Sequence, residues 1–299
     1  DFVLPVGGGS AIDAAKAIAA GVHYDGDPWD FFMHQARVEK ALPVGTVLTL
    51  AATGSEMNAG TVVNNEESMQ KRPLMSSHII PRFSILDPEN TYSVNERQSA
   101  SGIADIWSHT MEQYFSAVNT AHVSDRFAEG IFSVLLDWGP KVLENPRHYE
   151  ARANIMWAGT MALNGLLQAG KDGGDWATHM IEHEVSALYD LTHGIGLAII
   201  TPHWMEYVLD EGNAPRFAAY ARNVFGIVEH NDMKAARLGI DETRYFFTEL
   251  GIPDKLKYED IPKDKFEEMA EKAVVFGPVG GLKKLAKADI MHILQAAYE

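Results

Sequence analysis

The chain has 299 residues, of which 46% are hydrophobic, so it can build one large or two ordinary globular domains. Its formal net charge of −16 and its scattered Lys and Arg residues disfavour nucleic acid and anionic membranes as partners, because both need a basic surface. It has no cysteine, which excludes disulfides, thiolate metal ligands and cysteine nucleophiles and fits a cytoplasmic protein, and it has no apolar stretch long enough to span a membrane.

The first predicted elements are a short buried strand at residues 2–6, a glycine turn at 7–9, and a helix over 11–21 that Ser10 could cap. This order suits a phosphate group, because glycines let backbone N–H groups approach a pyrophosphate and the N-terminus of a helix favours an anion. The turn matches neither GxGxxG nor a Walker A loop, so a plain tight connection between strand and helix remains the alternative.

A second buried strand is predicted at residues 44–51, and it leads into a loop at 49–56 that is rich in hydroxyl groups and small residues. Such a loop can hydrogen-bond a ribose or a phosphate, and an ordinary turn with a helix cap is the alternative. Residues 61–63 and 81–88 suggest further strands.

From Ser93 onward the periodicity becomes helical, and residues 93–96 fit a capping box. We therefore expect an α/β domain over residues 1–93 and an all-helical domain over 94–299. Residues 251–265 are rich in proline and charge and predict a surface connection. The predicted helices cover about 101–118, 122–138, 147–169, 175–190, 195–210, 214–226, 231–250 and 264–275.

Histidines are concentrated in one part of the helical region. His179 and His183 are four residues apart and so lie on one face of a helix, and His193 stands just before Gly194, where that helix could end. Neutral imidazole is the commonest metal ligand among side chains, so the group is a candidate metal site. Three ordinary surface or core histidines are the alternative.

Asp105 and His109 form a second pair at helical spacing, a carboxylate followed by an imidazole. One aspartate and three histidines would make a site of three nitrogens and one oxygen for a divalent transition metal, with no sulfur ligand.

These motifs, taken together and in this order, closely resemble those of the iron-dependent (group III) alcohol dehydrogenase family. Within it they look most like the butanol dehydrogenase and broad-specificity aldehyde reductase branch, and the resemblance covers essentially the whole chain. The motifs are GGGSxxDxxK at 7–16, TLAATGSEMN at 49–58, DxxxH at 105–109, and HxxxH at 179–183 with His193.

The resemblance implies an α/β nucleotide-binding domain with an N-terminally incomplete Rossmann-like sheet, followed by an all-α metal-binding catalytic domain. It implies a metal-dependent, NAD(P)-linked alcohol dehydrogenase or aldehyde reductase that interconverts short-to-medium primary alcohols and aldehydes by hydride transfer. The metal would be Fe²⁺ or Zn²⁺, NADP(H) is expected in preference to NAD(H), and the protein would be a cytoplasmic homodimer.

The resemblance also assigns roles to single residues. The implied metal ligands are Asp105, His109, His179 and His193. The implied cofactor contacts are Gly7, Gly8, Gly9, Ser10, Asp13, Thr49, Thr53, Ser55, Asn58 and Lys71. His183 matches a histidine that lines the site without ligating, and we expect it to relay a proton, since an unligated imidazole titrates near neutrality.

Three other readings stay open. A metal-dependent hydrolase would use the same ligands to activate water, but it has no need of the glycine turn. A silent binding or scaffold protein would not be expected to keep all four ligand types. An enzyme like glycerol dehydrogenase or dehydroquinate synthase, within the same superfamily, would use a different ligand set.

The glycine turn begins at the seventh residue. An open dinucleotide-binding sheet needs several parallel strands, each joined by a crossover of about 30 residues. We therefore expect that the strands flanking this turn on its N-terminal side, and the residues that choose between NAD and NADP, are not in this chain. The first strand should then lie at an unpaired edge.

Overall fold

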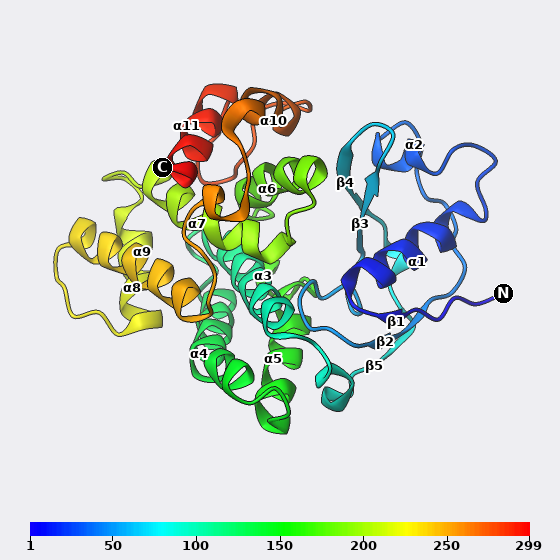
Figure 1. Cartoon of the computed structure of the whole chain (residues 1–299), viewed down its shortest axis with the longest axis horizontal. Helices are drawn as coiled ribbons and strands as arrows, with labels where there is room; N and C mark the ends of the chain where they lie inside the picture. The colour runs from blue at the N-terminus through cyan, green and yellow to red at the C-terminus, as the bar shows by residue number, and fades with distance from the viewer.

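The computed structural model describes residues 1–299 and consists of an α/β part and a larger helical part (Figure 1). Every strand of the two sheets precedes residue 86, and all the helices longer than α1 follow residue 95. The predicted fold class, an α/β part followed by an all-helical part, is therefore confirmed. The predicted division between residues 93 and 94 falls in the segment before the first long helix and stays a prediction. No helix is both long and apolar enough to cross a membrane.

The α/β part contains a three-stranded parallel sheet and a separate antiparallel hairpin. The sheet has the order β1 (Val6–Gly7), β2 (Gly45–Leu48) and β5 (Phe83–Ile85), so β1 lies at an edge. The hairpin pairs β3 (Gly60–Asn65) with β4 (Gln70–Met75). The helices of this part are α1 (Gly9–Gly21) and the short α2 (Trp29–Phe32).

Two expectations for this part are wrong, and the strand expected at 61–63 is confirmed as part of β3. The segment 2–6 is not a buried strand: Val6 is 63% exposed and Leu4 is 50% exposed. Ser10 does not cap α1, because Gly8 occupies the N-cap position and Ser10 already lies within the helix. The strand at 61–63 is one half of a hairpin whose second half, β4, contains Lys71 and was not expected because Pro73 interrupts its apolar pattern.

The helical part differs from the sequence expectation at several ends. Asn95, not Ser93, caps α3, and its side chain accepts a hydrogen bond from the backbone N–H of Gln98 at 2.8 Å. The segment 251–265 is only partly a surface connection, because Leu256 and Ile261 are buried. The bounds are α3 (Glu96–Tyr114), α4 (His122–Glu144), α5 (Tyr149–Ala162), α6 (Ala177–Tyr189), α7 (His193–Val208), α8 (Ala214–Phe225), α9 (Asp232–Glu249), α10 (Phe266–Ala273) and α11 (Lys287–Tyr298).

Helix α6 does not continue to His193. It ends at Tyr189, where Asp190 adopts a left-handed conformation with φ of 51°, and His193 is instead the first residue of α7. Aspartate tolerates this conformation better than most residues, so it can terminate a helix. The break turns the chain, and it lets α6 and α7 present histidines to one region from two directions.

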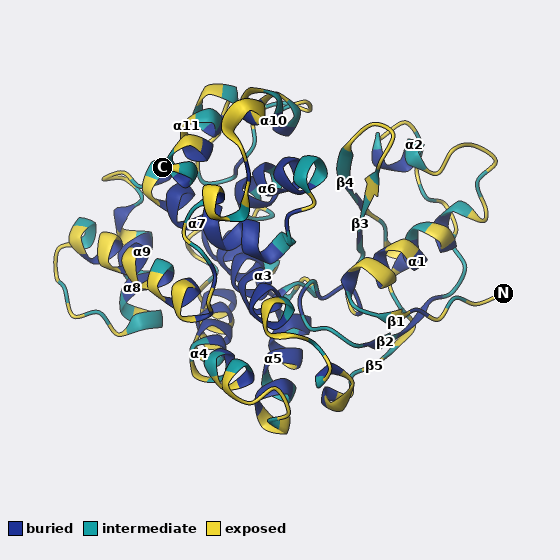
Figure 2. Cartoon of the chain, in the orientation of Figure 1, coloured by how far each residue is buried: buried dark blue, intermediate teal, exposed yellow.

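Helix α3 forms the centre of the helical part. Every residue from Ser99 to Tyr114 is buried, and α4, α5 and α7 pack around the helix (Figure 2). A helix that is covered on all sides normally carries apolar residues throughout. The polar residues of α3 therefore need buried partners. This need is greatest for the ionisable residues Asp105, His109 and Glu112.

The α/β part contacts α3 and α5 through glycines. A Cβ atom on Gly102 of α3 would lie only 2.4 Å from the backbone oxygen of Ala51, and a Cβ atom on Gly54 would lie 3.1 Å from the backbone oxygen of Gly159 in α5. The loop that follows β2 thus lies directly against the helix that carries Asp105, three residues after Gly102.

This close approach predicts that Gly102→Ala lowers the stability of the protein by about 1–3 kcal/mol, because the added methyl group forces backbone to move. Gly130→Ala is the matched control: it also lies inside a helix, α4, but its Cβ atom would meet nothing within 4 Å. We expect that control to be neutral or to stabilise by about 0.5–1 kcal/mol. Urea unfolding of both variants measures the difference, and equal effects would contradict the close packing.

Candidate active site

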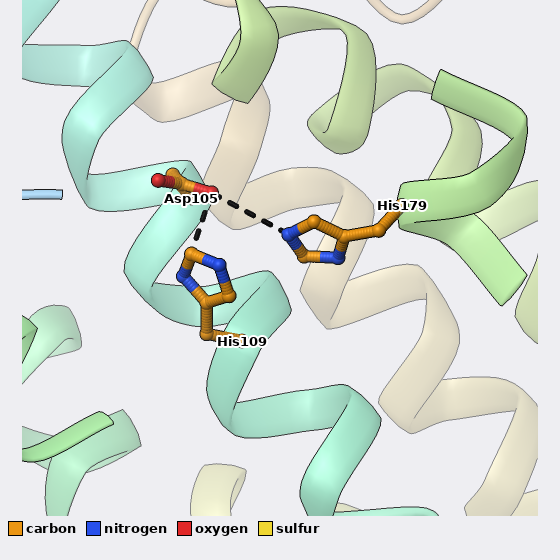
Figure 3. A group of neighbouring side chains, drawn as sticks. All are labelled: Asp105, His109 and His179. Atoms are coloured by element: carbon orange, nitrogen blue, oxygen red, sulfur yellow. Dashed lines mark ion pairs between the residues drawn. The ribbon is translucent and has the colours of Figure 1, made fainter. Parts of the chain in front are cut away.

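Three helices bring one carboxylate and three imidazoles together. Asp105 Oδ1 lies 3.5 Å from His109 Nδ1 and 3.7 Å from Nε2 of both His179 and His193. Asp105 and His109 are one turn apart on α3, His179 lies in the first turn of α6, and His193 begins α7. Figure 3 shows the carboxylate of Asp105 facing the rings of His109 and His179. The structure therefore brings the four predicted ligands into one cluster.

Two further carboxylates orient the rings. Glu112 of α3 accepts a hydrogen bond from His179 Nδ1, and Glu182 of α6 accepts one from His193 Nδ1. These bonds place a proton on Nδ1 of each ring and leave Nε2 as the atom directed at Asp105. Glu112 is itself held by the backbone N–H and the hydroxyl of Thr178, at 2.8 Å and 2.6 Å.

Several polar atoms of the cluster have no hydrogen-bond partner although they are buried. They are Asp105 Oδ1, His109 Nδ1 and His179 Nε2. Unsatisfied buried polar atoms are rare in native proteins, and three that converge on one point suit the binding of a cation. Three nitrogens and one oxygen suit Fe²⁺ or Zn²⁺, and the residues present therefore fit a divalent metal.

The ionisable residues of the cluster differ in the direction of their pKa shifts. Burial alone would raise the pKa of Asp105, but His109, His193 and His179 outweigh it and hold that pKa below its ordinary value. Burial lowers the pKa of His109 to about 4. Burial also opposes the charged form of His179, yet Glu112 and Asp105 raise its pKa to about 10. The cluster is thus a buried carboxylate that attracts positive charge.

His183 lines the cluster from the next turn of α6. Its ring centroid lies 5.3 Å from that of His193, and its Nδ1 is buried without a partner. Burial, followed by the charge of Lys71, holds the pKa of His183 well below its ordinary value. This differs from the expectation of an imidazole that titrates near neutrality, since His183 is uncharged over that range. Its role stays a prediction.

The glycine turn and the hydroxyl loop of the α/β part contact each other. The backbone N–H of Thr49 donates to Gly7 O at 3.0 Å. A Cβ atom on Gly9 would lie 2.5 Å from Thr53 Oγ1, and one on Gly8 would lie 3.1 Å from Leu50 Cβ. The two predicted segments are therefore packed together at the N-terminus of α1, where Ser10 is exposed.

Three other predicted cofactor residues make contacts within the protein. The buried carboxylate of Asp13 accepts hydrogen bonds from Ser55 Oγ and, at 2.8 Å, from the backbone N–H of Val62, and burial raises its pKa to about 6. Asn58 accepts from Lys16 Nζ at 3.1 Å and donates to Thr53 O at 3.1 Å. In this structure these residues brace α1, β3 and the loop, and direct contact with a cofactor stays a prediction for them.

Lys71 lies next to the metal cluster. Its Nζ atom is 3.3 Å from His193 Nδ1 and 3.8 Å from Glu182 Oε2. Strand β4 pairs with β3, and the backbone N–H of Val62 in β3 donates to Asp13 of α1. Lys71 therefore stands between the metal cluster and α1.

Glu112 and Glu182 are functional residues that are absent from the sequence-based prediction. A signal for them exists: each follows a histidine of the cluster by three residues, Glu112 after His109 and Glu182 after His179. The structure shows that neither carboxylate serves that neighbour, because each binds a histidine of another helix or turn.

Comparison with known proteins decides the family. Residues 1–88 match "Iron-containing alcohol dehydrogenase", and residues 99–298 match "Fe-containing alcohol dehydrogenase family, C-terminal". The chain belongs to the iron-containing alcohol dehydrogenase family. The resemblance predicted from the motifs is thereby confirmed, and membership implies a divalent metal and a nicotinamide cofactor.

Individual relatives indicate which branch of this family the chain resembles. The chain is 47% identical to NADH-dependent butanol dehydrogenase A of Clostridium acetobutylicum, over 100% of this chain and 77% of that protein. It is 44% identical to the NADPH-dependent aldehyde reductase YqhD of Escherichia coli, over 85% of this chain and 66% of that protein. The crystal structure of NADH-dependent butanol dehydrogenase A from Thermotoga maritima matches with a TM-score of 0.96 at 37% identity, covering 100% of this chain and 76% of the other.

The geometry predicts different metal contents for variants of three histidines. His193→Ala should lose bound metal, because it removes an imidazole whose Nε2 faces Asp105. His183→Ala should retain the metal, since its ring lies beside the cluster. His203→Ala is the control, a buried histidine of the same helix as His193 with no contact to Asp105.

Metal analysis of the three variants after loading with Zn²⁺ checks this assignment. If His183→Ala lost the metal and His193→Ala retained it, then His183 would be the ligand and the assignment of His193 would be wrong.

Proposed function

We propose that this chain is a metal-dependent, NAD(P)-linked alcohol dehydrogenase or aldehyde reductase that interconverts short-to-medium primary alcohols and aldehydes. The observation that carries the proposal is the convergence of one carboxylate and three imidazoles, in a chain that also has a glycine turn at the N-terminus of α1. The names of its relatives, butanol dehydrogenase and aldehyde reductase, support the same substrate class.

The metal ligands in this proposal are Asp105, His109, His179 and His193. When bound, a divalent ion supplies a Lewis acid that polarises the oxygen of the substrate. Glu112 and Glu182 fix the ring orientations of His179 and His193, so the site is ordered before any ligand enters. Asp105, His109 and His179 are buried and the side chain of His193 is 24% exposed, so most of the cluster is shielded from bulk water, which strengthens electrostatic interactions inside it.

The cofactor would lie along the side opposite to the metal ligands. Backbone N–H groups of Gly7, Gly8, Gly9 and Ser10 at the start of α1 bind the pyrophosphate, because the N-terminus of a helix favours an anion. A bound nicotinamide would supply or accept the hydride. The other residues proposed to contact or brace the cofactor are Asp13, Thr49, Thr53, Ser55, Asn58 and Lys71.

His183 is the proposed proton relay. It is a neutral imidazole beside His193, and its unpartnered Nδ1 can hydrogen-bond a ligand in the site. A neutral ring holds one proton and offers one lone pair, so it can pass a proton between the substrate oxygen and water.

Three finer points belong to the proposal. We propose NADP(H) in preference to NAD(H), although relatives of both kinds are known: butanol dehydrogenase A is NADH-dependent and YqhD is NADPH-dependent. Iron and zinc both suit the ligand set. A homodimer and a cytoplasmic location complete the expectation.

Two alternatives are not favoured. A metal-dependent hydrolase could use the same four ligands, but the chain belongs to a family of alcohol dehydrogenases and keeps the glycine turn. A polyol dehydrogenase of the glycerol dehydrogenase kind would use a different ligand set from the one that converges on Asp105.

A panel of short and medium aldehydes and alcohols, assayed with NADH and with NADPH, tests this function. We expect turnover of primary alcohols and their aldehydes, abolished by chelation and restored by Fe²⁺ or Zn²⁺, because the substrate oxygen needs the Lewis acid. Full activity of rigorously metal-free protein would contradict the metal role. Absence of turnover with either cofactor would contradict the function.

A further inference from the structure

A buried ion pair joins the α/β part to the helical part beside the candidate site. Arg72 of β4 donates from Nη1 to Glu184 Oε1 of α6 at 2.7 Å, and the two side chains are 1% and 0% exposed. We propose that Arg72 and Glu184 are positioning residues that hold the ammonium of the neighbouring Lys71 in the cleft next to His193, where it contacts the nicotinamide cofactor. This inference rests on the proposed function.

The Arg72–Glu184 contact is well suited to fix a position. Arg72 Nε and Nη2 and Glu184 Oε2 are buried with no hydrogen-bond partner, so the contact from Nη1 to Glu184 is the one that pairs the two charges. Nη1 also donates to Lys71 O at 3.5 Å. A buried charge that loses its partner is strongly disfavoured, which opposes any sliding of β4 along α6. The ring of Phe276, from the segment after α10, lies 5.9 Å from the guanidinium carbon. The arginine is thus inserted between two segments of the helical part.

The fixed position of Arg72 also restricts Lys71, because Lys71 is the adjacent residue of the same strand. Adjacent strand residues are about 3.3 Å apart along the strand, so a fixed Arg72 restricts where the backbone of Lys71 can lie. Lys71 Nζ then reaches within 3.8 Å of Glu182 Oε2 and 3.3 Å of His193 Nδ1. The Lys71 side chain is 15% exposed, whereas that of Arg72 is 1% exposed.

The location of Lys71 indicates what it meets. On one side lies the cluster around Asp105, and on the other lies α1, whose Asp13 is tied to β3 by the backbone N–H of Val62. Strand β3 pairs with β4 through Asn64 and Lys71. A nicotinamide that exchanges hydride with a substrate at the metal, while its pyrophosphate sits at the N-terminus of α1, must pass this point.

A double-mutant cycle separates positioning from simple stabilisation. Arg72→Met/Glu184→Leu removes both charges together, so that no unpaired charge is buried and the protein can fold. Lys71→Met removes the ammonium, and a third variant combines all three changes. Arg97→Gln, which breaks the exposed Arg97–Glu259 ion pair, is the control. The measurements are the dissociation constants of NADH and NADPH without substrate, the metal content and the unfolding temperature.

We expect the Arg72/Glu184 variant and Lys71→Met each to weaken cofactor binding about tenfold with unchanged metal content, as loss of a charge-assisted contact predicts. The combined variant should be no weaker than Lys71→Met within about twofold, because both changes act through one ammonium. Arg97→Gln should bind as wild type does.

Two results would overturn the inference alone: multiplication of the two effects in the combined variant, or unchanged cofactor binding by the Arg72/Glu184 variant. Failure of the wild-type protein to bind either nicotinamide would overturn the proposed function and this inference with it.

Discussion

The structure depends on the burial of a carboxylate in the middle of a helical core. Asp105 is 2% exposed on a helix that is covered on all sides, and a charge in such a place is costly unless it is compensated. Three imidazoles supply that compensation in part, and a divalent cation would complete it. The ends of α6 and α7 meet α3 where they do because His179 and His193 must both reach this one carboxylate.

A second layer of buried carboxylates extends the same arrangement. Glu112 and Glu182 are fully buried, and each is satisfied by a histidine of the cluster and by a hydroxyl group, of Thr178 and Ser186 respectively. Removal of one member leaves its partner buried and unpaired, so the network is ordered as a unit. Rigid ligands of this kind favour a fixed coordination geometry.

The α/β part is held against this core at points close to the chemistry. Ala51 packs on Gly102, Thr160 of α5 donates to Glu56, and Arg72 pairs with Glu184. These contacts set the distance between the glycine turn and the metal cluster. A hydride can pass only over a short distance, so that spacing is part of the catalytic geometry.

The candidate site is largely predictable from the sequence because ligand spacing is a local property. Asp105 with His109, and His179 with His183, are pairs at helical spacing, and a glycine turn before a helix is read directly. The partners of Glu112 and Glu182 are not predictable in this way, because each carboxylate reaches a side chain that only tertiary packing brings near.

The fold shows the same limit. Apolar periodicity predicts most helices, yet α11 (Lys287–Tyr298) was within reach of the same argument and was not expected. The break between α6 and α7 depends on the left-handed Asp190, which no periodicity reports. The exposure of Val6 in β1 cannot be predicted from the sequence either, because an apolar segment does not indicate whether another part of the protein covers it.

X-ray absorption spectroscopy of the zinc-loaded or iron-loaded protein tests the central claim most directly. We predict a first shell that contains three imidazole nitrogens and one carboxylate oxygen at about 2.0–2.2 Å, with the outer-shell scattering that imidazole rings produce. A shell composed of oxygen ligands, or one with fewer than three imidazoles, would contradict the convergence of His109, His179 and His193 on Asp105.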